Sequence, residues 1–468
     1  MRKFNYNPLV TSKDLDILID RIGESQFVLL GEASHGTSEF YKWRSEISKR
    51  LILEKKFSFI AVEGDWPDCF RVNRFIKGFS NSDHNKSAYD IMNSFNRWPT
   101  WMWANKEMIE LVEWLKEYND TILNQQKLST SLDKQIGFYG LDLYSLWESM
   151  EAIIEYLKKV DSSALKNAID AYNCFEPYNK NVEEYARATA FVPQNCEDEI
   201  IELLSSMKTK RDLYSKNNQQ NKEEEYFNAE QNAITAKDAE QYYRTMIRGD
   251  VNSWNLRDTH MTDMLERLVN FHHNQDGVTT NIKPKAIVWA HNTHIGDARF
   301  TDMNRSKMIN LGQLVREKKG VENTVLVGFS TYSGTVIAAP EWGKEMQMMN
   351  VPSAIEGSWD HILHNLECYQ YDKKQLDKLI IFDQGSQTSK NGSLDYIDVS
   401  QSDDKNRGQR AIGVVYNPSY ERYGNYVPTI LSSRYDALLF IDNTRALSPL
   451  HIKQSDDKDL PETFPTGE

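Results

Sequence analysis

The chain has few cysteines, no long apolar run and fewer basic than acidic residues. Its four cysteines, Cys69, Cys174, Cys196 and Cys368, lie far apart and form no C-x-x-C pair. We therefore expect neither a disulfide framework nor a cysteine-based zinc site. No apolar run approaches the roughly 20 residues that cross a bilayer, and the first ten residues lead into no apolar signal-peptide core. These absences predict a cytoplasmic protein with no membrane partner.

The charge balance excludes one class of partner. The 55 Lys and Arg residues against 68 Asp and Glu residues give a net charge of −13, whereas proteins that bind a phosphate backbone are basic. We therefore expect no nucleic-acid partner.

The length of 468 residues and the 40% apolar content are enough for a large core, and they predict one core domain with an inserted domain. Composition says nothing of the oligomeric state.

Several catalytic motifs are also missing. The sequence has no G-x-x-x-x-G-K-[ST], no G-x-G-x-x-G after a predicted strand and no H-E-x-x-H, which argues against phosphate-cradling loops and zincin chemistry. The nucleophile elbow G-x-S-x-G is absent as well, because Ser34 has Glu32 two positions before it. A Ser34 nucleophile is therefore not favoured.

What the sequence does contain is a set of short β-branched and aromatic runs that predict buried strands. Most of them are continuous rather than alternating, which is the pattern of strands covered by helices on both faces. An α/β sandwich is the fold class that follows. The runs are Phe27–Leu30, Phe57–Val62, Ile136–Tyr139, Ala286–Trp289, Thr324–Phe329, Ile412–Tyr416 and Leu438–Ile441.

The runs also suggest how the chain is divided. Residues 143–269 are polar and favour helix, with only Pro177 and Pro193 in the stretch, which predicts a helical insertion. It separates the two halves of the α/β core, residues 1–142 and 270–450. Residues 451–468 form an acidic tail that we expect to be mobile, and the polar segment 401–410 is predicted to be a surface loop.

Ionisable residues follow four of the predicted strands. Glu32 and His35 come after the first, Glu63 after the second, Asp142 after the third, and His291 and His294 after the fourth. The carboxyl ends of parallel strands meet along one edge of a sheet, where ligands bind, so residues some 260 positions apart can converge there. The sequence therefore predicts an active site at this edge.

Several residues near these strand ends have both a functional and a structural interpretation. Glu32 and His35 are three residues apart and share a face if the turn is helical, and a helix N-terminus would keep His35 neutral and able to act as a base. The alternative is a satisfied polar residue near the core. Arg44 follows on the predicted helix Glu39–Leu53, either in the site or in a surface ion pair. Asp258 could orient a site residue or pair with Arg257.

Four tryptophans are close in sequence to these strand ends: Trp66, Trp98, Trp101 and Trp103. As walls of a cleft they would suit a bulky, mostly apolar ligand. The alternative is that they are ordinary core residues.

The segment Gly31-Glu32-Ala33-Ser34-His35-Gly36 resembles the erythromycin esterase family, and the resemblance extends from about Phe27 to Leu450. Glu32 and His35 match the family's Glu-x-x-His, Arg44 its helix arginine, Glu63 the glutamate that ends the second strand, and His291 and His294 its His-Asn-x-His. The resemblance implies a three-layer α/β/α core with a mostly parallel sheet and an inserted helical domain. It also implies metal-independent hydrolysis of an ester by water that His35 activates, with no cofactor.

Three segments differ from the macrolide-resistance esterases and resemble a sister subgroup: Glu63–Asp68, Trp101–Trp103 and Ser253–Asp258. The expected substrate is therefore a macrolide lactone or a related small-molecule ester. We expect Glu32 or Glu63 to orient His35 and the water, His291 with Arg44 to stabilise the oxyanion, and His294 with the four tryptophans to bind substrate.

Two alternatives remain open. The same glutamates and histidines could bind a divalent metal such as Zn, Mn or Fe, which would make the protein a metal-dependent hydrolase. A fold similar to that of a haem-iron binding lipoprotein group would instead suggest a ligand-binding protein without catalysis.

Overall fold

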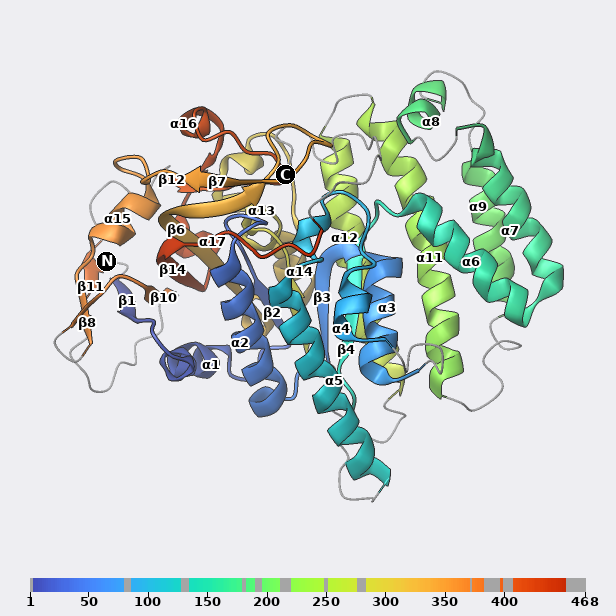
Figure 1. The fold of residues 1–468 in the computed structure, drawn as a ribbon, viewed down its shortest axis with the longest axis horizontal. Coiled ribbons are helices and arrows are strands. Elements are labelled where there is room, and N and C mark those ends of the chain that lie inside the picture. Colours follow the sequence, from blue (N-terminus) through green and yellow to red (C-terminus); the bar gives the residue numbers. More distant parts are fainter. Residues whose placement is uncertain are drawn as a thin grey trace.

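The computed structural model describes residues 3–79, 86–127, 134–178, 182–189, 196–210, 220–247, 251–275, 283–370, 373–382, 396–398 and 407–451. Among these residues, ten strands form one large sheet (Figure 1). Their spatial order is β11 (Tyr396–Asp398), β1 (Lys3–Pro8), β10 (Lys378–Phe382), β14 (Ala437–Thr444), β6 (Thr324–Ala338), β2 (Phe27–Leu30), β5 (Ala286–Trp289), β3 (Phe59–Asp65) and β4 (Gly137–Asp142), and β7 (Gln347–Val351) pairs with β6.

The sheet is parallel from β14 to β4. Strands β10, β1 and β11 add antiparallel pairs at one end, and β7 is antiparallel to the last part of β6. In the parallel region β2 and β5 are buried along their whole length. A strand covered on both faces has no solvent side for polar residues, which explains its continuous apolar sequence. The predicted mostly parallel sheet is confirmed.

Six of the seven predicted runs are strands in the structure. Strands β2 and β5 have the predicted bounds, and β3, β4, β6 and β14 overlap their runs. The prediction for Ile412–Tyr416 is wrong. Ile412 and Val415 form only isolated bridges, to Ser34 and Ala339, because this segment passes beyond the ends of β2 and β6 instead of lying beside them.

Helices cover both faces of the sheet. On one face, α1 (Asp16–Ile22), α2 (Ser38–Lys55) and α5 (Lys106–Lys127) share a core with Val28, Ile60 and Ile287. On the other, α12 (Asn252–Gln275), α14 (Leu311–Lys319) and α15 (Trp359–Asn365) share a core with Leu29 and Val288. Successive strand residues point to opposite faces, so each strand contributes to both cores. The three-layer α/β/α fold is confirmed.

The described residues between β4 and β5 form helices and no strand. They are α6 (Leu146–Val160), α7 (Ser162–Phe175), α8 (Val182–Thr189), α9 (Glu197–Thr209), α11 (Gln220–Met246) and α12. Most of these helices gather at one end of the molecule, at the right of Figure 1. There they have a core of their own that includes Trp147, Met150 and Tyr242. The predicted domain boundaries at 143 and 269 stay predictions.

One cysteine prediction is wrong. Cys174, near the end of α7, and Cys196, just before α9, form a disulfide. The cysteines are 22 residues apart, and no sequence motif marks the pair. They meet because α7 and α9 pack together in the helical core, which sequence spacing alone does not reveal. The side chains of Cys69 and Cys368 are buried.

The prediction of a surface loop at 401–410 is also wrong for the residues of this segment that the structure describes. Arg407–Arg410 form strand β12, which pairs with β13 (Tyr426–Thr429), whereas 401–406 lie outside the described residues. The side chain of Arg410 is buried, and its hydrogen bonds compensate for the loss of water. It donates to Glu421 Oε1 at 2.5 Å and to the Thr331 carbonyl at 2.9 Å. The predicted mobile tail lies almost wholly outside the described residues.

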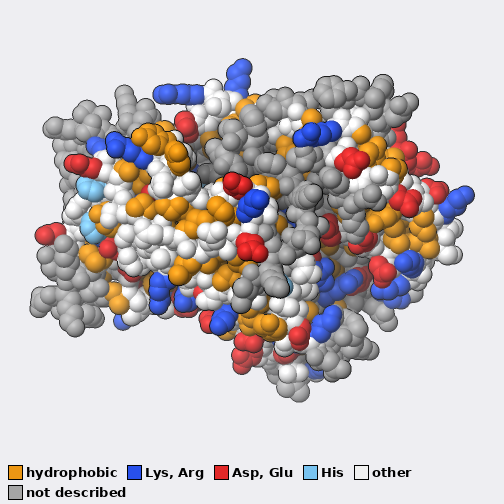
Figure 2. Space-filling model, turned by 45° about the horizontal axis from the view of Figure 1, so that its top comes forward, with side chains coloured by type: hydrophobic (Ala, Val, Ile, Leu, Met, Phe, Trp, Pro, Cys, Tyr) orange, Lys and Arg blue, Asp and Glu red, His pale blue; other side chains and the backbone are white. Residues whose placement is uncertain are grey.

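No helix in the described part of the chain is long and apolar enough to cross a membrane. On the face shown in Figure 2, acidic and basic side chains are interspersed among apolar ones. The cytoplasmic location stays a prediction.

Candidate active site

The polar residues that follow the parallel strands meet at the carboxyl edge of the sheet. The His291 backbone N–H, just after β5, donates to Glu63 Oε2 on β3 at 2.8 Å. Arg257, on α12, donates to Glu63 Oε1 at 2.6 Å and to Asp142 Oδ2, on β4, at 2.7 Å. The rings of His35 and His291 lie 4.9 Å apart between centroids. The convergence expected from the strand ends is therefore present in the structure.

His35 is held by a local carboxylate. Its Nδ1 lies 2.9 Å from Glu32 Oε1, and Arg44 Nη2 donates to Glu32 Oε2 at 2.6 Å. Since a carboxylate only accepts, the proton lies on His35 Nδ1, and Nε2 of the neutral ring is an acceptor. His35 borders a cavity although its side chain is only 2% exposed. The arrangement leaves Nε2 able to take a proton.

Arg44 lies behind Glu32 and is absent from the cavity wall. Its guanidinium packs over the rings of Tyr41, at 4.4 Å, and Trp289, at 4.6 Å. The side chain is fully buried, so the ion pair with Glu32 is shielded from water. The geometry therefore suits Arg44 to holding Glu32 rather than to contacting substrate.

His291 has a defined tautomer. Its Nδ1 accepts from the Thr293 N–H at 3.3 Å, and Thr293 Oγ1 lies 2.8 Å from the same nitrogen. Burial lowers the pKa of His291 well below its usual value, so the ring is neutral. Its proton is therefore on Nε2, a buried nitrogen with no hydrogen-bond partner among the described residues. That N–H is available to an acceptor that the structure does not contain.

Glu63 is the centre of the polar network. Burial would raise its pKa, but His294 and Arg257 hold the pKa well below the usual value. Glu63 is therefore a carboxylate that binds Arg257 and the backbone of His291. It does not contact the His35 ring at hydrogen-bond distance in this structure, where Glu32 occupies Nδ1.

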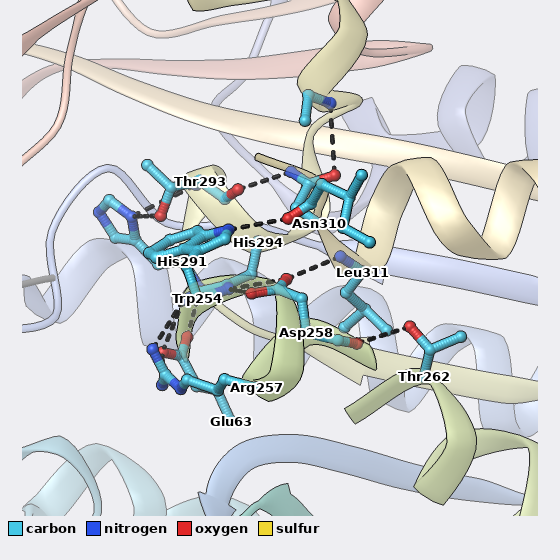
Figure 3. A network of polar contacts seen from close by, with 12 residues as sticks. Glu63, Trp254, Arg257, Asp258, Thr262, His291, Thr293, His294, Asn310 and Leu311 are labelled. Atoms are coloured by element: carbon cyan, nitrogen blue, oxygen red, sulfur yellow. Dashed lines mark hydrogen bonds and ion pairs between the residues drawn. The ribbon is translucent and has the colours of Figure 1, made fainter. Parts of the chain in front are cut away.

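His294 is buried in the same polar network as Glu63, Arg257 and Asp258 (Figure 3). Its Nδ1 lies 3.0 Å from both carboxylate oxygens of Asp258, and its ring stacks on Trp254 at 4.7 Å. Its Nε2 lies 3.3 Å from Glu63 Oε1 and 3.0 Å from Arg257 Nη1. Burial lowers the pKa of His294, yet Asp258 and Glu63 together raise it to about 10. His294 is buried and lies away from the cavity wall.

The cavity beside His35 has a polar and an aromatic part. Its walls are His35, Glu63, Gly64, Asp65, Asp68, Phe95, Arg97, Pro99, Thr100, Met102, Trp103, Asp142, Arg257, Trp342 and Val414. Glu63 and Asp65 end β3, and α3 (Trp66–Lys77) starts directly after them with Pro67 in its first turn, which suits a helix start. This abrupt junction places both carboxylates at the cavity.

The four predicted tryptophans have different positions. Trp103 borders the cavity. Trp66 is buried in the core, where it stacks on Tyr139 and donates to Asn228 Oδ1 at 2.9 Å. Trp98 and Trp101 pack edge to face beside the cavity wall without being part of it. Trp342, which sequence reasoning did not single out, contacts Trp98 and borders the cavity.

Sequence reasoning named Asp142 and Arg257 but assigned them no role. Asp142 had the same strand-end signal as Glu63, whereas Arg257 lies on a helix and had no such signal. Asp258 orients His294, which is one of its two predicted roles. No group of three or more His, Cys, Asp or Glu residues suited to a metal ion is found in the part of the chain that the structure describes.

The fold and the site define an α/β/α protein whose histidines and carboxylates meet at the carboxyl edge of a parallel sheet. The chain belongs to the erythromycin esterase family, whose model matches residues 52–444. The match begins after Glu32, His35 and Arg44 and therefore does not include these three residues.

Individual relatives are distant. The erythromycin esterase type II of Escherichia coli is 25% identical over 156 residues, which is 32% of this chain and 32% of that protein. The chain thus matches about a third of the length of this curated relative.

Solved structures share the fold over nearly the whole chain. A succinoglycan biosynthesis protein is 22% identical, with 96% of both chains covered and a TM-score of 0.69. A Bacillus cereus protein is 19% identical, with 96% of this chain and 97% of that chain covered and a TM-score of 0.69. A mutant of the erythromycin esterase EreC in its open conformation is 13% identical, with 94% and 98% covered and a TM-score of 0.61.

Proposed function

We propose that this protein is a carboxylic-ester hydrolase in which His35 activates water to open a macrolide lactone or a related small-molecule ester. The observation that carries the proposal is the contact between Glu32 and His35 Nδ1, at 2.9 Å, beside the cavity. It leaves Nε2 without a proton in the neutral ring. A histidine at a cavity wall, with one ring nitrogen held by a carboxylate, is the arrangement of a general base.

The first step is attack by water. His35 Nε2 takes one proton from the water as its oxygen adds to the ester carbonyl carbon. Glu32 stabilises the imidazolium that forms, and Arg44 holds Glu32 in place through the buried contact at 2.6 Å. When the tetrahedral intermediate breaks down, His35 returns the proton to the departing alcohol oxygen. The acid and the alcohol are the products.

The carbonyl oxygen becomes negative during this step and needs a donor. We assign this role to His291, because its Nε2–H has no partner among the described residues and its ring is 4.9 Å from that of His35. His291 itself is fully buried behind the cavity wall. A buried N–H that is already oriented stabilises an oxyanion at little cost in reorganisation. Arg44, which we expected to share this role, is instead assigned to Glu32 because it lies behind that residue.

Glu63, Arg257 and His294 form the support of the site. Glu63 accepts from the His291 backbone N–H at 2.8 Å, which fixes the start of the segment that carries His291. Substrate would contact Trp103 and Trp342, whereas Trp66 is buried in the core. No metal or cofactor takes part in the proposed reaction, and no nucleic acid or membrane is involved.

The proposal is tested by turnover. Purified protein should release acid from a panel of activated esters, simple lactones and macrolides, followed by mass spectrometry. Dialysis against a chelator, with elemental analysis of the protein before and after, separates the two hydrolytic mechanisms. Activity that is lost with bound zinc or manganese and regained on its return would favour the metal-dependent alternative. A protein that binds members of the panel and hydrolyses none would be a binding protein.

A further inference from the structure

The cavity extends beyond His35 to a second carboxylate that the proposed reaction does not use. Asp65 borders the cavity and its side chain is nine-tenths buried, with 6% of the residue exposed. Arg97 Nε donates to Asp65 Oδ2 at 2.5 Å. The other oxygen, Oδ1, is buried and has no hydrogen-bond partner among the described residues. A buried carboxylate oxygen without a donor is costly, which points to a donor that a ligand would bring.

The charges around Asp65 favour a cationic ligand. Four carboxylates border the cavity, on Glu63, Asp65, Asp68 and Asp142, against the guanidinium groups of Arg97 and Arg257. Arg257 is bound to both Glu63 and Asp142, and Asp68 is paired with Arg71. Burial raises the pKa of Asp65 to about 6, so its carboxylate is ionised at pH 8. Asp65 Oδ1 is the acceptor that these cations leave unused.

Aromatic rings complete the surroundings of this acceptor. Phe95, Trp103 and Trp342 border the same cavity as Asp65. The faces of aromatic rings attract cations, and rings combined with a carboxylate are the surroundings in which proteins bind alkylammonium groups. An anionic ligand would be repelled by the unpaired carboxylate oxygen. A neutral hydroxyl could donate to Oδ1, but it would lack the attraction between a cation and the ring faces.

The position of Asp65 suits one end of an ester whose other end is at His35. Asp65 is two residues after Glu63 on β3, and both side chains border the same cavity as His35. Glu63 in turn binds the backbone of His291, whose ring neighbours His35. A small substrate can therefore reach both His35 and Asp65 within one cavity.

We propose that the substrate is an ester or lactone that carries a protonated or quaternary amine, which binds between Asp65 and the rings of Phe95, Trp103 and Trp342. The assignment of the substrate class rests on the proposed hydrolase function. The cation site itself does not, because it can be measured by binding alone.

Choline and 3,3-dimethylbutan-1-ol test the site directly, since they have nearly the same shape and differ in charge. At pH 8, calorimetry should show that choline binds wild-type protein more tightly, on the order of 10–100-fold. Asp65→Asn should remove most of this difference. Asp302→Asn is the matched control, and it should keep the difference because Asp302 is exposed and is not part of the cavity wall. Equal binding of both probes by the wild type, or no choline binding, would overturn the proposal.

Kinetics then connect the site to the reaction. The ratio of kcat/KM for butyrylcholine to kcat/KM for 3,3-dimethylbutyl butyrate should exceed 10 in the wild type and approach 1 in Asp65→Asn. A loss of both activities in equal proportion in Asp65→Asn would mean a structural role and would contradict the inference. If choline binds as expected but no ester of any kind is hydrolysed, the hydrolase function fails while the cation site stands.

Discussion

Asp258 holds His294 through both carboxylate oxygens, each 3.0 Å from His294 Nδ1 (Figure 3). Asp258 also accepts from the Leu311 N–H at 2.7 Å, so it joins α12 to α14 and to α13 (Asn292–Ile295), the short helix that carries His294. Arg257, the preceding residue on α12, reaches Glu63 and Asp142 from this fixed position. The contact therefore positions the helix that supplies the arginine of the site.

We predict that, because of this contact, the free energy of unfolding decreases as the pH rises above 7. Asp258 and Glu63, acting against burial, raise the pKa of His294 to about 10, whereas an unfolded chain has a histidine pKa of about 6.5. The stabilisation is fully present below the unfolded pKa and is lost as the pH rises toward 10. The free energy of unfolding should therefore fall by up to about 1.4 kcal/mol per pH unit between pH 7 and 10.

Urea denaturation at several pH values measures this slope, and His294→Asn should be less stable at pH 7 with a flatter profile. A wild-type profile as flat as that of the variant would show that His294 is neutral in the folded protein.

Loss of the general base should reduce turnover without unfolding the protein. His35→Ala should lower kcat on the order of 10²–10⁴-fold, because the water then has no base to take its proton. His273→Ala is the matched control, since His273 is exposed near the end of α12 and should keep full activity. Both variants should have the circular dichroism spectrum of the wild type. Near-normal activity in a folded His35→Ala protein would remove His35 from its assigned role.

Glu32 and Arg44 should act as a unit in stability. Arg44→Met leaves Glu32 buried without its cation and should destabilise the protein by about 3–5 kcal/mol. Adding Glu32→Gln removes the unpaired charge, so the double variant should be more stable than the sum of the single changes predicts. Chemical denaturation of the four proteins gives the coupling energy. Additive effects would mean that the two side chains do not interact in solution.

Direct attack by water predicts that no acyl-enzyme forms. Ser34 Oγ is hydrogen-bonded to Thr37 Oγ1, and Ser34 does not border the cavity. Ser34→Ala should therefore change kcat by only a few-fold, and mass spectrometry of the wild type during turnover should find no covalent adduct. A fall in activity as large as that of His35→Ala, together with an acyl group on Ser34, would replace direct attack by a two-step mechanism.

Part of the candidate site could be predicted because its contacts are local in sequence or follow from strand ends. Glu32 and His35 are three residues apart, and the structure pairs them. Glu63 and His291 each follow a buried strand, and parallel strands bring such residues to one edge. The disulfide between Cys174 and Cys196 could not be foreseen, because it depends on how two helices of the inserted region pack.

The sequence by itself determined the sheet, since continuous apolar runs such as Phe27–Leu30 and Ala286–Trp289 can be satisfied only between two layers of helices. Only the tertiary structure decided which carboxylate binds which histidine or arginine. Asp258 reaches His294 across 36 residues, and Arg257 reaches Glu63 across 194. Such pairs arise because α12 packs beside β4 and the buried charges there must find partners, and packing at that distance leaves no periodic signal in the chain.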